Sequence, residues 1–227
     1  MLNINLLYIV SVMLFVSFSQ CDNSDSSGVD KVISMDLPFR TNPSGMWQIG
    51  FSKDTVLAFN QFELSTSSDT SDIIGLWHPG ASQSEYYPYV GQNRGKVSKA
   101  EKTNGWAARA GQIPMEASNT GQYSMLRFVA PATGKYVVKV TFEGLHFNLS
   151  STDVHVLLNS QRLFDDFVQG YGGDPGFHPI EGTRPSTNYI DTLLLQKGDI
   201  ITFAVGYGKN KNHYNDTTGL IISIETI

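Results

Sequence analysis

The sequence predicts an all-β protein, an antiparallel β-sandwich of the jelly-roll type, behind a disordered N-terminal leader and tether. From Met46 onward the dominant hydrophobic period is two residues, which is the period of a strand. Turn residues interrupt the apolar runs about every 8–12 residues, as in sandwiches and barrels. No segment shows a sustained helical period with caps. The chain has 227 residues, 41% of them hydrophobic, which is enough for the core of one large sandwich.

The clearest predicted strand runs from Tyr136 to Glu143, where every second residue is apolar. Such alternation is typical of an antiparallel strand with one buried and one solvated face. Similar strands are expected at Val154–Leu158, Arg162–Val168, Tyr189–Leu195, Ile200–Tyr207 and Leu220–Ile227. The turn Lys197-Gly198-Asp199 predicts a hairpin between the strands on its two sides.

The N-terminus has the pattern of an export signal. Residues Leu6 to Phe18 are an uncharged apolar stretch of 13 residues, which suits a secretory signal and is short for a transmembrane helix. The stretch ends near Cys21, so residues 1–21 resemble a bacterial lipoprotein signal with Cys21 as the lipidated residue. Cleavage after Ser19 with plain secretion, and a retained anchor, are the alternatives. The protein is therefore expected to be exported, either as a lipoprotein of the outer membrane or cell surface or as a secreted protein.

Two domain-scale segments follow the signal. Residues 22–45 begin with an acidic, serine-rich run that cannot bury enough apolar surface to fold, and they are predicted to be a flexible tether and lead-in. Residues 46–227 are predicted to be a single binding domain, because neither half has a boundary that would let it bury its own core.

Charge and cysteine content exclude several classes of function. The net charge is −5 and the pI is about 5.5, with no cluster of Lys or Arg, so a nucleic-acid partner is not expected. Cys21 is the only cysteine in the sequence. The predicted domain therefore has no thiol for a disulfide, a thiolate metal site or a cysteine nucleophile.

Four strings, taken in their order and spacing, carry a resemblance: YSMLRFVAPATGKY at 123–136, DVHVLLN at 153–159, KGDIITFAVG at 197–206 and NDTTGL at 215–220. The set resembles β-sandwich domains of secreted and surface-attached bacterial proteins that have the character of carbohydrate-binding modules. The resemblance implies the fold and a role in glycan binding. It assigns no ligand and no binding residue.

Aromatic and polar residues in loop-like segments are the candidates for a sugar site, because a sugar offers an apolar C–H face and a ring of hydroxyls. They are Trp77, Tyr86, Tyr87, Arg94, Trp106, Arg109 and Tyr171. Tyr171 belongs to a long Gly-rich and aromatic loop, Gln169 to Pro179. The alternative is that the aromatics fill the core and that the loop is a simple connection.

The sequence signals for a metal site and for catalytic residues are weaker than those for a sugar site. Asp153, Asp199 and Asp216 could hold a structural calcium ion with backbone carbonyls, although aspartates in turns also serve local hydrogen bonds. No carboxylate pair sits in a glycosidase motif, and the five histidines are scattered, so no catalytic residue is assigned and no cofactor is required. His155 lies between Val154 and Val156 and is expected to face the opposite side of its strand.

These observations lead to three hypotheses. The first is a surface-attached or secreted carbohydrate-binding protein that captures polysaccharide by aromatic stacking and polar contacts. The second is an adhesion or assembly subunit that binds a protein partner, and the third is a polysaccharide-degrading enzyme. The exposure of the three tryptophans separates the first two: two exposed, coplanar indoles would favour glycan, whereas burial of all three would favour protein binding.

Overall fold

The computed structural model describes residues 41–53, 55–62, 64–65, 74–80, 87–96, 99–101, 105–172 and 185–227. The predicted signal peptide with Cys21, and residues 22–40 of the predicted tether, lie outside the described residues. In the described part of the chain, no helix is both long and apolar enough to cross a membrane.

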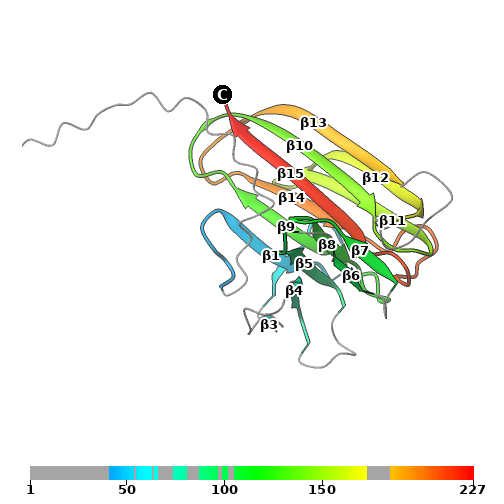
Figure 1. The fold of residues 1–227 in the computed structure, drawn as a ribbon. Coiled ribbons are helices and arrows are strands. Elements are labelled where there is room, and N and C mark those ends of the chain that lie inside the picture. Colours follow the sequence, from blue (N-terminus) through cyan, green and yellow to red (C-terminus); the bar gives the residue numbers. More distant parts are fainter. Residues whose placement is uncertain are drawn as a thin grey trace, which may run out of the picture.

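Two large antiparallel sheets and one small strand pair make up the described structure (Figure 1). Sheet A has the order β13 (Ser186–Leu195), β10 (Gly134–Gly144), β15 (Thr218–Thr226), β8 (Ile113–Glu116), β5 (Tyr89–Asn93), β4 (Ile74–His78) and β3 (Leu64–Ser65). Sheet B has the order β12 (Gln161–Tyr171), β11 (Leu149–Leu158), β14 (Ile200–Val205), β9 (Ser124–Val129), β1 (Trp47–Phe51) and β2 (Asn60–Gln61). β6 (Lys99–Glu101) pairs with β7 (Trp106–Ala108). The predicted all-β sandwich is confirmed.

The strands form where the period-two pattern predicts them. In β10 the residues Tyr136, Val138, Val140 and Phe142 are buried, while the exposed or half-buried Lys135, Val137, Lys139 and Thr141 alternate with them. The apolar face of β10 therefore lies on the core, and its polar face lies on the solvent side. β11 to β15 likewise overlap the other five predicted strands, with ends that differ by a few residues.

One core lies between the two sheets. Sheet A contributes side chains such as Phe142 and Leu220, and sheet B contributes Leu126, Val156 and Phe203, all of them almost completely buried. Side chains of both sheets thus fill a single layer, as in other face-to-face sandwiches.

The predicted hairpin at Lys197-Gly198-Asp199 is wrong. Gly198 does occupy a turn, with a φ of 92° that favours glycine. However, β13 pairs with β10 in sheet A, whereas β14 pairs with β11 and β9 in sheet B. The turn passes from one sheet to the other because the apolar faces of β13 and β14 bury in the core from opposite sides. The neighbouring hairpin is β11–β12, which turns at Asn159 with a φ of 55°.

A second apolar cluster covers part of the outer face of sheet B. Its buried members are Val56, Met125, Leu157 and Ala204, with Phe59 and Tyr123 packed against them. Met125, Leu157 and Ala204 project from sheet strands away from the main core, so the segment that carries Val56 and Phe59 lies over the outside of the sheet.

β12 and β13 are the terminal strands of their sheets and lie at the same side of the sandwich (Figure 1). Each carries an aspartate whose carboxylate accepts a hydrogen bond from the next residue's backbone N–H: Phe167 to Asp166 at 2.8 Å, and Thr192 to Asp191 at 2.7 Å. Thr187 of β13 also donates to Asp166, so the two terminal strands are bridged. Both carboxylates thus accept hydrogen bonds from backbone N–H groups of edge strands, which pair with another strand on one side only.

Candidate ligand-binding pocket

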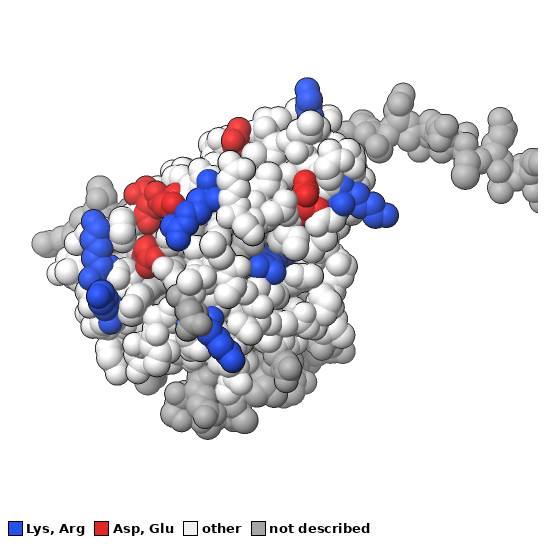
Figure 2. Space-filling view, turned by 180° about the vertical axis from the view of Figure 1, so that it is seen from behind, with Lys and Arg blue, Asp and Glu red and all other residues white. Residues whose placement is uncertain are grey.

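A pocket of about 350 Å³ opens on the outer face of β11 and β12, which is within the roughly 300–1,000 Å³ typical of small-molecule sites. Acidic and basic side chains lie next to one another on the left of this face when the molecule is seen from behind (Figure 2). The residues that line the pocket are Tyr123, Asp153, His155, Arg162, Asp165, Asp166, Phe167, Tyr207, Gly208 and Lys209.

Strand register brings the polar lining together. Val154 and Val156 belong to the main core, so His155 between them projects to the outer face, as the sequence predicts. His155 is paired with Asp165, and Asp153 is paired with Phe167. Paired residues on antiparallel strands project from the same side, so these four side chains share one surface.

The imidazole of His155 is held between two carboxylates. Its Nδ1 contacts Oδ1 of Asp165, and its Nε2 lies 2.8 Å from Oδ2 of Asp153. Each ring nitrogen therefore faces one carboxylate oxygen. The ring also meets Tyr123 edge to face, with centroids 5.4 Å apart. Its position is therefore fixed from three sides.

Asp153 is the inner anchor of the pocket. Burial on its own would raise the pKa of Asp153, but hydrogen bonds from His155, from the Gly208 backbone N–H and from Tyr123 lower it below its usual value. The Gly208 N–H lies 2.7 Å from Oδ1 of Asp153. Burial, followed by the charge of Asp153, raises the pKa of Tyr123, so this phenol stays protonated. Asp153 is thus an ionised group inside a fixed set of donors.

The backbone at Gly208 makes this contact possible. Its φ is 68°, and a Cβ added there would lie 1.7 Å from the carbonyl oxygen of Ser151. Glycine is therefore required at this position for both conformation and space.

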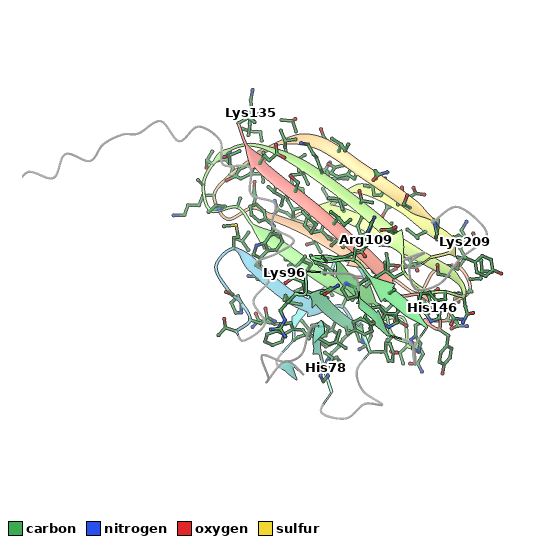
Figure 3. All side chains as sticks on the ribbon, viewed as in Figure 1. His78, Lys96, Arg109, Lys135, His146 and Lys209 are labelled. Carbon is green, nitrogen blue, oxygen red and sulfur yellow. The ribbon has the colours of Figure 1, made fainter. Side chains whose placement is uncertain are left out.

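The rim of the pocket combines charges and an aromatic ring. Arg162 Nη1 lies 3.1 Å from Oδ1 of Asp165, and both side chains are about half exposed. Lys209 Nζ lies 4.2 Å from the centre of the Phe167 ring, and Phe167 is 42% exposed. Lys209 is at one end of the sandwich and Lys135 is at the other (Figure 3). The rim therefore presents donors, acceptors and an apolar ring together, which can bind a ligand that has both hydroxyls and an apolar face.

The structure buries the three tryptophans. Trp47, Trp77 and Trp106 are each 4% exposed. Trp47 and Trp77 belong to the main core, and Trp106 packs with Ala108 and Leu145 in a small separate cluster. Large apolar side chains in these strands have a core to fill, so neither Trp77 nor Trp106 presents an open ring surface. Ligand contact by these two residues stays a prediction that their burial does not favour.

The other sequence candidates lie in different places. Tyr87 is half-buried with its ring 4.5 Å from that of His213, and burial raises its pKa to about 12. Arg109 is ion-paired with Glu143, which also accepts a hydrogen bond from Gln112. Arg94 is exposed after β5. None of these three lines the pocket described above.

Tyr171 is 49% exposed at the end of β12, on the strand that lines the pocket. Tyr86 lies outside the described residues, as does most of the loop that follows Tyr171.

The three candidate calcium ligands are not gathered at one point. Asp199 accepts hydrogen bonds from the Gln196 N–H at 2.7 Å and from Asn159, in the turn between β13 and β14. Asp153 and Asp216 are near enough to interact electrostatically. Across the residues that the structure describes, no group of three or more His, Cys, Asp or Glu is arranged to hold a metal ion. A calcium site stays a prediction.

Sequence reasoning missed most of the pocket. Asp165, Asp166 and His155 were visible as polar residues in predicted strands, but a strand pattern does not say which strand lies beside it. Tyr123 and Tyr207 come from segments far from β12 in the sequence. The register of β11 with β12 brings together the lining residues that these two strands carry.

No known protein family matches the sequence, and no curated protein matches it. Solved structures that the chain is similar to include carbohydrate-binding modules. One is a family 35 module from Clostridium thermocellum, at 10% identity over 67% of this chain and 88% of that chain, with a TM-score of 0.30. Another belongs to family 4, at 10% identity over 73% and 96%, with a TM-score of 0.33.

A third similar structure is the isomalto-dextranase of Arthrobacter globiformis T6, in which 80% of this chain matches 23% of the enzyme at 10% identity and a TM-score of 0.29. The chain is thus an antiparallel β-sandwich with carbohydrate-binding modules among its distant structural neighbours.

Proposed function

We propose that this chain is a carbohydrate-binding protein whose sugar site is the pocket on the outer face of β11 and β12. The observation that carries the proposal is the combination, in one pocket, of an exposed ring and charged groups held in place. Phe167 supplies the ring, and Asp165 and Arg162 supply an acceptor and donors at the rim. A sugar binds through its apolar C–H face and its hydroxyls. The Phe167 ring can contact the C–H face, and the polar groups of Asp165 and Arg162 can bind the hydroxyls.

Fixed geometry supports the proposal. Asp165 is oriented by both His155 and Arg162, and His155 is itself held by Asp153. Side chains that are ordered before a ligand arrives lose little conformational freedom on binding, so more of their interaction energy contributes to affinity.

Affinity electrophoresis of the full chain against soluble β-glucan, xylan, galactomannan and α-glucan, together with a glycan array, tests the proposal. We expect at least one polysaccharide to retard the chain. Phe167→Ala is expected to weaken binding between about twofold and tenfold, the range for loss of one aromatic contact. Asp165→Asn removes the charge with little change of shape and should also weaken binding.

Ile190→Ala is the matched control, because Ile190 is 69% exposed on β13, the terminal strand of the other sheet. It removes a comparable exposed apolar side chain and should leave retardation unchanged. The absence of retardation and of array binding for the unaltered chain would refute the proposal. Assay of the same incubations for released reducing ends tests the enzyme hypothesis, for which product release that is lost in Asp165→Asn would be the positive result.

Attachment to the cell surface through a lipid on Cys21 is part of the same proposal. An apolar stretch that ends near a cysteine, followed by a polar run, supports it. Metabolic labelling with a radioactive fatty acid should label the chain, and Cys21→Ser should abolish the label. A chain that is released unlabelled into the medium would instead support plain secretion.

A protein-binding role is the second candidate, and the burial of all three tryptophans favours it. The surface that would serve it is the outer side of β13, where Ile190 and Leu194 are 69% and 67% exposed. This role requires that Ile190→Lys abolish binding of a purified partner and that Phe167→Ala leave it intact. The proposed glycan site requires the opposite response from the two variants.

A further inference from the structure

The pocket is one end of a longer row of residues on the β11–β12 ribbon. Residues of β12 that share its outer side are Asp165, Phe167, Gln169 and Tyr171, paired in order with His155, Asp153, Ser151 and Leu149 of β11. The alternate residues Val154 and Val168 are buried on the other side. The row therefore continues from the pocket to the end of the ribbon.

Three apolar surfaces along this row are open to solvent. Phe167 is 42% exposed, Tyr171 is 49% exposed and Leu149, paired with Tyr171, is 52% exposed. Gln169 lies exposed between the two rings, where its amide can meet hydroxyls. The combination of an aromatic ring and a polar group, which the pocket has at Phe167, is thus present again at Gln169 and Tyr171 further along the strand.

Spacing decides the size of the ligand that can use both rings. Phe167 and Tyr171 are four residues apart on one strand, which is about 13 Å at the rise of an antiparallel strand. One sugar ring stacks on one aromatic ring, so a monosaccharide in the pocket cannot reach Tyr171. A ligand that contacts both must be several sugar units long.

We propose that the pocket and the row ending at Tyr171 form one extended site that holds an internal stretch of a polysaccharide chain, with Tyr171 as its distal stacking residue. This inference rests on the proposed carbohydrate-binding function and names the class of its ligand. The open row allows the chain to run along the ribbon, whereas a site for a terminal sugar needs only the pocket.

The test uses oligosaccharides of one to six units cut from a polysaccharide that retards the full chain, measured by isothermal titration calorimetry. Affinity is expected to rise with length beyond the disaccharide. Tyr171→Ala should weaken binding of the hexasaccharide between about twofold and tenfold and leave the disaccharide unaffected. Tyr171→Phe keeps the ring and should bind as the unaltered chain does, and Ile190→Ala is again the control.

The outcomes separate the two proposals. A monosaccharide that binds as tightly as the hexasaccharide, with no effect of Tyr171→Ala, would overturn the extended site and leave the pocket in place. Failure of every polysaccharide and array glycan to bind would overturn the proposed function, and the extended site with it. Loss of all binding in Phe167→Ala but none in Tyr171→Ala would confine the site to the pocket.

Discussion

Asp216 is expected to make the stability of this protein depend on pH in the neutral range. Its side chain is completely buried, Oδ1 accepts the Ser151 N–H at 2.7 Å, and Oδ2 has no hydrogen-bond partner among the described residues. Burial raises the pKa of Asp216 to about 7, against the opposing effect of the Ser151 N–H and with help from the charges of Glu116 and Asp153. The protonated carboxyl is therefore the form that the fold favours.

The sign and size of the effect follow from linkage. The pKa rises from 3.8 in the unfolded chain to about 7 in the folded one, so the folded state binds more protons between these values. The free energy of unfolding then falls as pH rises through this window, by about 4 kcal/mol in all at 1.36 kcal/mol per unit. Between about pH 5 and pH 8 the loss is roughly 2.5 kcal/mol.

Asp216→Asn removes the titrating group and tests this reasoning. Its Oδ1 can still accept the Ser151 N–H, but its amide adds a buried donor without a partner, at a cost of about 1–3 kcal/mol. Urea unfolding in EDTA at several pH values should show that the variant loses less stability than the unaltered chain as pH rises. Asp199→Asn is the control, because Asp199 also accepts a backbone N–H at 2.7 Å but lies in an exposed turn. Parallel stability curves for the unaltered chain and Asp216→Asn would refute the reasoning.

Four further predictions use the same unfolding and solution measurements. Gly208→Ala places a Cβ against Ser151 at a φ of 68° and should cost about 2–4 kcal/mol and reduce glycan binding; unchanged stability would contradict the requirement for glycine. Phe142→Ala in the core should cost about 3–5 kcal/mol in urea unfolding, and a loss below 1 kcal/mol would contradict its packing. Asp191→Val frees the Thr192 N–H on the terminal strand β13 and should promote self-association, seen by light scattering; a strictly monomeric variant would show that this carboxylate does not protect the edge. Calcium bound at the predicted site should raise Tm relative to EDTA, and coincident unfolding curves would refute that site.

Strand positions in the second half of the chain could be predicted because the signal is local. Alternation in Tyr136 to Phe142 reports which residues face the core, whatever strand lies beside them. The same logic predicted that His155 would face away from Val154 and Val156. Side-chain direction in a strand is set by backbone geometry, so it is readable from sequence.

Which strands pair with one another could not be predicted in the same way. The Lys197-Gly198-Asp199 turn was visible, but whether it joins strands of one sheet or two depends on where each apolar face finds its core. The location of the tryptophans could not be predicted either, because an indole suits both a hydrophobic core and a sugar-binding surface. Trp47 and Trp77 lie in the main core, where strands from distant parts of the chain enclose them.

By itself the sequence determined the class of fold, the direction of the strand side chains and the absence of thiols after Cys21, since each depends on composition or on neighbours in the chain. The tertiary structure alone decided which polar residues share a surface. Asp165 meets His155, and Phe167 lies opposite Asp153, because β12 pairs with β11 in that register. A shift of the pairing by two residues would keep every side chain on its own face but change which of them lie opposite one another, and alternation within one strand does not specify that choice.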